Sequence, residues 1–196
     1  MTLRDVAATV RRWARDAVPT LVMLALLLAA RSSLADQYLV PSESMEATLQ
    51  VGDRIAVDKR AYGWRVPFTD VVVAEGAAPA VGEVVIFDSP VDGTRLVKRV
   101  VAVGGDVVAV QGGRVWRNGG FVDEPYRDLG AGGGPALAPV RVPAGALLVL
   151  GDNRGESFDG RSFGWVRAAA VYGRVLGVFW RGGAPAWAEV DGSTAQ

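Results

Sequence analysis

After Asp36 the sequence consists of short, valine-rich runs, and glycine, proline, aspartate or asparagine separates each run from the next. Runs of this kind are typical of strands in an all-β barrel or sandwich. We expect strands over residues 38–40, 54–57, 83–87, 96–103, 106–110, 146–150 and 175–180. A length of 196 residues suits one domain with a small appendage. The sequence therefore predicts a mainly β domain over 36–196, with a small β appendage.

Two segments of this β region differ from the rest. Residues 166–172 are the only helix-like stretch. Residues 130–139 hold four glycines and two prolines, which favours a mobile surface loop.

The N-terminal region resembles a membrane anchor. The 14 residues 17–30 carry no charge, whereas a spanning helix needs about 20 residues. Continuing to Ala35 gives 19 residues if Arg31 extends toward the lipid headgroups. We predict an anchor over 17–35, with the arginine-rich residues 1–16 in the cytoplasm and 36–196 on the outer side. A cleaved secretory signal and a buried helix of a soluble domain are the alternatives.

The composition excludes several kinds of chemistry, because the chain contains no histidine and no cysteine. Thiolate nucleophiles, disulfides and Cys-ligated metals are absent, and so is the imidazole base of a Ser-His-Asp triad. We expect neither a metal nor a cofactor. Beyond Asp36 acidic side chains slightly outnumber basic ones, so no nucleic-acid partner is expected.

Pro41-Ser42-Glu43-Ser44-Met45 follows the expected anchor by a few residues. Proline and serine favour turns, and a strand-to-loop turn explains this pentapeptide by itself. Serine becomes a nucleophile only beside a base. Without histidine, that base is expected to be a lysine.

Only two lysines are present, Lys59 and Lys98. Lys98 lies in the longest β-type run, where an aliphatic environment would lower its pKa toward that of a working base. Periodicity does not decide the matter, because both faces of this run are apolar and Lys98 could equally face water from an edge strand. Lys59 stands near a turn between Asp58 and Arg60, which favours a solvated position.

The segment 151–161 is dense in polar side chains. Its Gly-Asp-Asn opening favours a turn, and a flexible polar loop is one interpretation. The other is that these groups surround a buried lysine or pair with Arg99.

Together these segments resemble type I signal peptidases, membrane-anchored serine proteases that remove signal peptides from exported proteins. The resemblance covers nearly the whole chain and keeps the order of the family's motifs. The matching segments are the N-terminal anchor, 40–53, 82–87, 97–106, 118–126 and 151–161. The departures are Ala47 where proline is usual, Gly104 where proline is common and Gly160 where serine is common.

The resemblance implies a role for each matching residue. Ser44 would be the nucleophile and Lys98 its general base. Ser42 would complete the oxyanion hole, and Ser157 would orient the lysine amine. The supporting residues would be Met45, Arg99, Asp152, Asp159 and Arg161.

The resemblance also implies a substrate and a place of action. The enzyme would cleave signal peptides of preproteins after an A-x-A-like site, at the outer face of a bacterial plasma membrane, in contact with lipid and as a monomer. One alternative is a specialised Ser/Lys peptidase for a single pilus or conjugation substrate. A self-cleaving repressor would need a DNA-binding domain where residues 1–35 indicate an anchor. A membrane-tethered β domain that only binds peptides is the remaining alternative.

Overall fold

The computed structural model describes residues 13, 15–25, 35–65, 71–128, 130 and 132–190. Residues 15–25 form a helix, and most of the remaining expected anchor, 26–34, lies outside the described residues. No helix in the described part of the chain is both long enough and apolar enough to cross a membrane.

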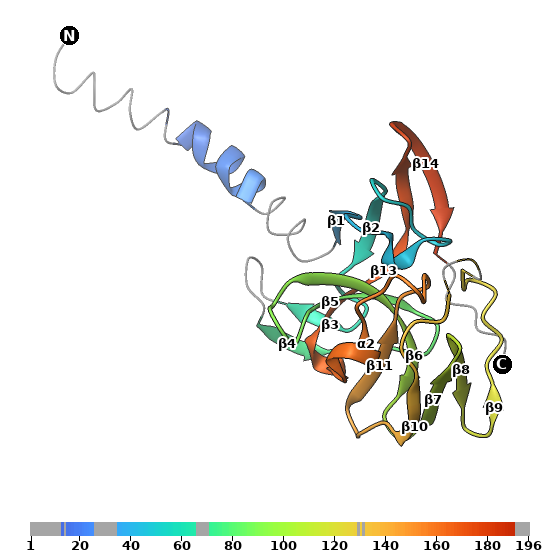
Figure 1. Ribbon diagram of the computed structural model, residues 1–196. Helices are drawn as coiled ribbons and strands as arrows, with labels where there is room; N and C mark the ends of the chain where they lie inside the picture. Colours follow the sequence, from blue (N-terminus) through green and yellow to red (C-terminus); the bar gives the residue numbers. More distant parts are fainter. Residues whose placement is uncertain are drawn as a thin grey trace, which may run out of the picture.

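The expected mainly β fold with a small β appendage is confirmed (Figure 1). The larger sheet has eight strands, with seven in the order β1-β2-β13-β5-β6-β11-β12 and β14 paired with β13. These strands are β1 Ala35–Leu39, β2 Arg54–Asp58, β5 Val84–Asp88, β6 Arg95–Val103, β11 Ala146–Leu150, β12 Val166–Arg167, β13 Val171–Arg181 and β14 Ala184–Glu189. Every strand pair in it is antiparallel.

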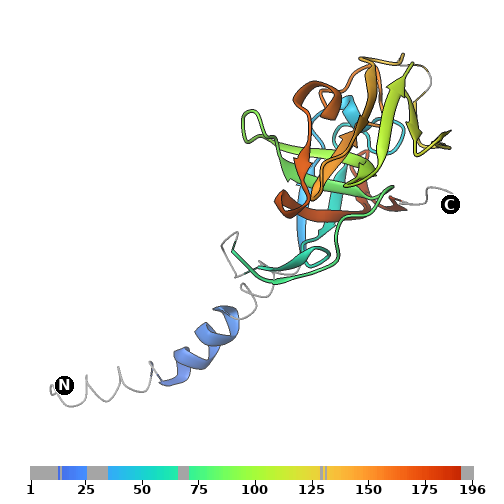
Figure 2. The same cartoon turned by 90° about the horizontal axis from the view of Figure 1, so that it is seen from below.

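The appendage is a four-stranded sheet in the order β10-β7-β8-β9. Its strands are β7 Val107–Gln111, β8 Arg114–Arg117, β9 Gly120–Phe121 and β10 Leu137–Arg141. A third, two-stranded sheet joins β3 Gly63–Arg65 to β4 Val72–Glu75. Figures 1 and 2 show the appendage at the end of the molecule away from β1.

Valine, leucine and isoleucine fill the core in three clusters. One lies beneath β1, β2 and β13 and includes Met45 and Leu49. Another packs the appendage against the larger sheet, through residues such as Val108 and Leu148. Because β-branched side chains fit a pleated, buried surface, the valine-rich runs form the strands that were expected from the sequence.

The helix expected over 166–172 is wrong. Residues 166–167 form β12, 168–170 form a single 3₁₀ turn (η2, Ala168–Ala170), and β13 begins at Val171. Val166 pairs with Leu147 and Val171 with Phe87, so burial against neighbouring strands overrides the local alanine content. The short helix of this region is α2, Gly160–Phe163.

The loop expected over 130–139 is corrected in part. Leu137 begins β10, which pairs with β7 through Leu137 and Val110. The prediction missed this strand because its alanine and proline do not form a valine-rich run. It also missed β3, β4, β8, β9 and β14, which are short or mostly exposed.

Candidate active site

The segment after β1 forms a tight 3₁₀ turn, η1 (Glu43–Met45), in which Ser44 and Met45 are buried. Met45 packs into the core cluster beneath β1. Two hydrogen bonds from Asn153 hold the turn: its backbone N–H donates to the Ser44 carbonyl at 3.2 Å, and its Nδ2 donates to the Glu43 carbonyl at 3.1 Å. The backbone of the turn that carries Ser44 is therefore held by a distant segment.

Lys98 of β6 reaches this turn. Its Nζ lies 2.5 Å from the Ser44 Oγ, and the lysine side chain is almost completely buried. Both Lys98 and the adjacent Arg99 are buried, so neither face of this part of β6 is solvent-exposed. Lys59, in contrast, is half-buried and lies over the Tyr172 ring, 4.8 Å from its centroid.

Burial lowers the pKa of Lys98 from 10.5 to about 8, because desolvation penalises the ammonium form. The negative charges of Asp159 and Asp152 raise the pKa and partly oppose this effect, whereas Arg161 lowers it. Part of the Lys98 population is therefore neutral near physiological pH, and only the neutral amine accepts a proton.

Two further serines flank the Ser44–Lys98 pair. The Ser42 Oγ lies 3.3 Å from the Ser44 Oγ. The Ser157 Oγ is buried and makes no hydrogen bond within the described residues, so the expected hydrogen bond from Ser157 to Lys98 is not formed in this structure. The segment 151–161 can approach the Ser44 turn closely because residue 151 is a glycine. A Cβ at that position would overlap Ser157 and the Ser44 carbonyl oxygen.

Arg99 and Asp152 form a buried, two-pronged ion pair. Arg99 Nε lies 2.9 Å from Asp152 Oδ1, and Nη2 lies 2.7 Å from Oδ2. Thr48, three residues beyond η1, donates to Asp152 Oδ2 at 2.6 Å, and the Tyr126 ring covers the guanidinium at 3.8 Å. This group joins β6 to the turn that holds Ser44.

Asp159 and Arg161 form a second pair in the same region. Arg161 Nη2 lies 2.8 Å from Asp159 Oδ2, and the carboxylate also accepts from the Gly151 N–H at 3.1 Å. Asp159 caps α2 by accepting from the Arg161 N–H. The structure thus brings the expected supporting residues together around Lys98.

Three further features of the site were not expected from the sequence: Asn153, Thr48 and the buried pair of Arg154 and Glu124. Arg154 Nη2 lies 2.5 Å from Glu124 Oε1 and connects the segment 151–161 to the appendage. Each of these residues lies inside one of the segments that resemble the family, 40–53, 118–126 or 151–161. Buried polar groups need hydrogen-bond partners, so the density of polar side chains in these motifs was the signal that further residues would pair there.

The departures from the family pattern have local explanations at two positions. Ala47 has a φ of 85°, which proline cannot adopt because its ring holds φ near −65°. At Gly160, a Cβ would press against the Val149 carbonyl oxygen and the Leu148 side chain.

No group of three or more acidic, histidine or cysteine side chains that could hold a metal occurs in the residues that the structure describes. The site consists instead of a hydroxyl, a buried amine and supporting ion pairs.

The chain is similar to known proteins over most of its length. The profile of the family described as signal peptidase, peptidase S26, matches residues 10–180. The chain is 35% identical over 168 residues to a probable signal peptidase I-2 of Synechocystis, which covers 82% of this chain and 69% of that protein. It is 34% identical over 218 residues to signal peptidase I of Mycobacterium tuberculosis, which covers 88% and 73%.

A solved signal peptidase I from Enterococcus faecalis is 28% identical, with a TM-score of 0.44, and covers 50% of this chain and 97% of that one. From the sequence matches, the chain is an enzyme of the serine protease class that acts in signal-peptide processing. It belongs to the signal peptidase family, peptidase S26.

Proposed function

We propose that the chain is a membrane-bound endopeptidase that cleaves N-terminal signal peptides from exported preproteins, with Ser44 as nucleophile and Lys98 as general base. The observation that carries this proposal is the 2.5 Å contact between the Ser44 hydroxyl and the Lys98 amine. A hydroxyl within hydrogen-bond reach of a group with a lowered pKa is the arrangement that activates serine.

In this mechanism neutral Lys98 accepts the Ser44 proton as the Oγ attacks the scissile carbonyl. Lys98 then returns the proton to the leaving amine, and the mature protein departs while the signal peptide remains as an acyl-enzyme. Lys98 next accepts a proton from the water that attacks the ester, and it returns this proton to the Ser44 Oγ as the ester bond breaks and the signal peptide leaves. Ser42 and the Ser44 N–H stabilise the oxyanion of each tetrahedral intermediate.

The substrate binds as an extended strand that leads to Ser44. In the described part of the chain, β1 pairs only with β2, and residues 95–98 of β6 pair only with β5. Each strand thus has a free edge that runs toward the Ser44–Lys98 pair. An extended peptide can add to such an edge through main-chain hydrogen bonds, with small side chains preferred at the A-x-A-like site.

The proposed topology places residues 1–16 in the cytoplasm, 17–35 in the membrane and 36–196, as a monomer, on the outer side of a bacterial plasma membrane. The nine residues from Ala35 to Ser44 span at most about 30 Å. Ser44 would therefore work close to the lipid surface, where a signal peptide leaves the bilayer.

The pH dependence of cleavage follows from the lowered pKa of Lys98. The amine is the active form, so activity should rise as the pH passes through about 8. We expect kcat/KM to increase about tenfold between about pH 7 and about pH 9. The measurement uses a substrate without groups that titrate in this range, with the thermal melt recorded at each pH as a control. A flat profile would mean that the base titrates elsewhere.

The proposal is tested by incubating the detergent-solubilised full chain with several unrelated preproteins. Wild type should cleave each after its A-x-A-like site, and the Ser44→Ala variant should cleave none while still binding the substrate. Cleavage of only one preprotein would indicate a specialised peptidase. Binding without cleavage by the wild type would indicate a peptide-binding domain.

A further inference from the structure

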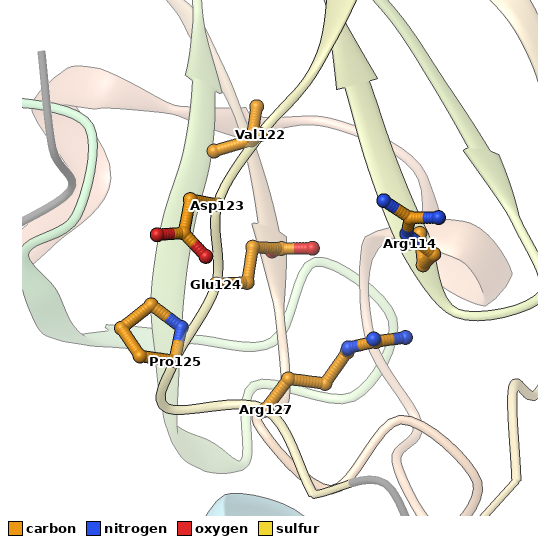
Figure 3. A pocket seen from close by; sticks show the side chains of 6 residues that line it. All are labelled: Arg114, Val122, Asp123, Glu124, Pro125 and Arg127. Carbon is orange, nitrogen blue, oxygen red and sulfur yellow. The ribbon is translucent and has the colours of Figure 1, made fainter.

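A cavity of about 270 Å³ lies in the appendage (Figure 3). Its lining residues are Arg114, Val122, Asp123, Glu124, Pro125 and Arg127. Arg114 begins β8, and the other five belong to the segment that follows β9. No step of the proposed mechanism uses this cavity.

Both arginines of the cavity lack an ionic partner. Within the described residues, neither Arg114 nor Arg127 forms an ion pair, and the Arg127 Nε is buried without any hydrogen bond. Arg114 lies over the Phe121 ring, 4.4 Å from its centroid, which fixes the direction of its guanidinium. The buried Arg127 Nε is a costly donor without a partner, and a bound anion would relieve that cost. Arg114 is exposed and would add its charge to the same anion.

The acidic residues of the cavity do not supply the missing partner. The Glu124 carboxylate already accepts hydrogen bonds from Arg154, from the Val115 N–H and from the Tyr126 hydroxyl. Figure 3 shows the Asp123 carboxylate pointing away from both arginines. The cavity therefore offers two guanidinium groups to an external anion.

The position of the cavity favours a peptide over a lipid headgroup. The proposed anchor joins the domain at β1, and the appendage lies at the other end of the molecule in both views. Tyr126, next to Arg127, packs on Arg99, the residue after Lys98. A substrate whose signal peptide lies toward β1 and whose scissile bond lies at Ser44 can therefore extend its mature part toward this cavity.

We infer that Arg114 and Arg127 form a subsite for an acidic side chain in the mature part of the substrate, shortly after the cleaved bond. Arginine recognises carboxylates through two parallel N–H···O bonds, and two arginines would hold one carboxylate from both sides. This inference rests on the proposed function, and it adds a charge preference on the far side of the scissile bond.

The test compares two preproteins that differ by one residue after the cleavage site, glutamate in one and glutamine in the other. For wild type, we expect the KM of the glutamate substrate to be about fivefold to tenfold lower, with similar kcat. The double variant Arg114→Gln/Arg127→Gln should lose this preference and cleave the glutamine substrate as wild type does. The preference should also shrink as the salt concentration rises.

Arg167→Gln is the matched control, because Arg167 is an exposed arginine on β12 that does not line the cavity. The charge-reversed variant Arg114→Glu/Arg127→Glu should prefer a lysine substrate. An unchanged glutamate preference in the double variant, or an equal loss for both substrates, would overturn the inference. The inference would also be overturned if the double variant lost binding to anionic vesicles but kept the glutamate preference. The cavity would then bind lipid phosphate.

Binding of the same two substrates to the Ser44→Ala variant, measured by fluorescence anisotropy, separates this inference from the proposed function. If wild type cleaves neither substrate, the proposed function fails, and the difference in binding still decides whether the subsite exists. If wild type cleaves both equally and the Ser44→Ala variant binds both equally, the subsite is absent and the proposed function stands.

Discussion

Replacing Lys98 with arginine is expected to lower turnover of a preprotein by at least about 10³-fold, although the positive charge remains. Arginine does not lose its proton in proteins, so it cannot accept the Ser44 proton. The measurement is single-turnover cleavage with a saturating preprotein, together with a thermal melt of the full chain. The melt matters because arginine is larger than lysine and must fit the same buried position.

The chain supplies its own control for this substitution, since Lys59 is the only other lysine. Lys59→Arg keeps a cation over the Tyr172 ring and should leave turnover unchanged. Lys98→Met gives a second variant of similar length without a charge, and it should be as inactive as Lys98→Arg. Wild-type turnover by either Lys98 variant, with the chain folded, would refute Lys98 as the base.

Replacing Asp152 with alanine is expected to destabilise the domain by about 3–5 kcal/mol, because it leaves Arg99 buried without its counter-ion. Arg99 is only 1% exposed, so water cannot replace the lost carboxylate. Thr48 would lose its acceptor in the same step, which loosens the turn that carries Ser44. The free energy of unfolding in urea measures the first effect, and turnover at a temperature well below the melt measures the second.

Asp58→Ala is the matched control. Asp58 pairs with Arg60 at the surface, at 3.4 Å, and the Arg60 side chain is 49% exposed. Its removal should cost less than about 1 kcal/mol. If Asp152→Ala fails to fold, Asp152→Asn keeps an acceptor for Arg99 and should fall between the two. An Asp152→Ala variant as stable as Asp58→Ala would contradict a structural role for the buried pair.

The strands that position the site could be predicted from the sequence, because they are buried and valine-rich. Strands β2, β5, β6, β7 and β11 lie where the runs predicted them, within one residue at each end. The strands that the prediction missed, such as β8 and β14, are paired mainly through their backbones and carry mixed or exposed side chains. Such strands form because a neighbouring strand is present, which no local pattern records.

The candidate site was predicted in part, and the missing part consists of contacts between distant segments. The sequence singled out Ser44 and Lys98, but their side chains meet across 54 positions of the chain. Asn153 clamps the Ser44 turn through its backbone and its side-chain amide, and nothing in the local sequence distinguishes it from an ordinary turn residue. The hydrogen bond predicted from Ser157 to Lys98 depends on side-chain geometry and is not formed in this structure.

By itself, the sequence determined which chemistry was open to this protein. Without histidine or cysteine, and with two lysines, a hydrolase of this chain has two candidates for a nitrogen base. The tertiary structure decided between them, since it buries Lys98 against Ser44 and leaves Lys59 half-buried beside an aromatic ring. The reason is that the pKa of an amine depends on its removal from water and on nearby charges, and only the packing of β6 against the turn and the segment 151–161 sets these.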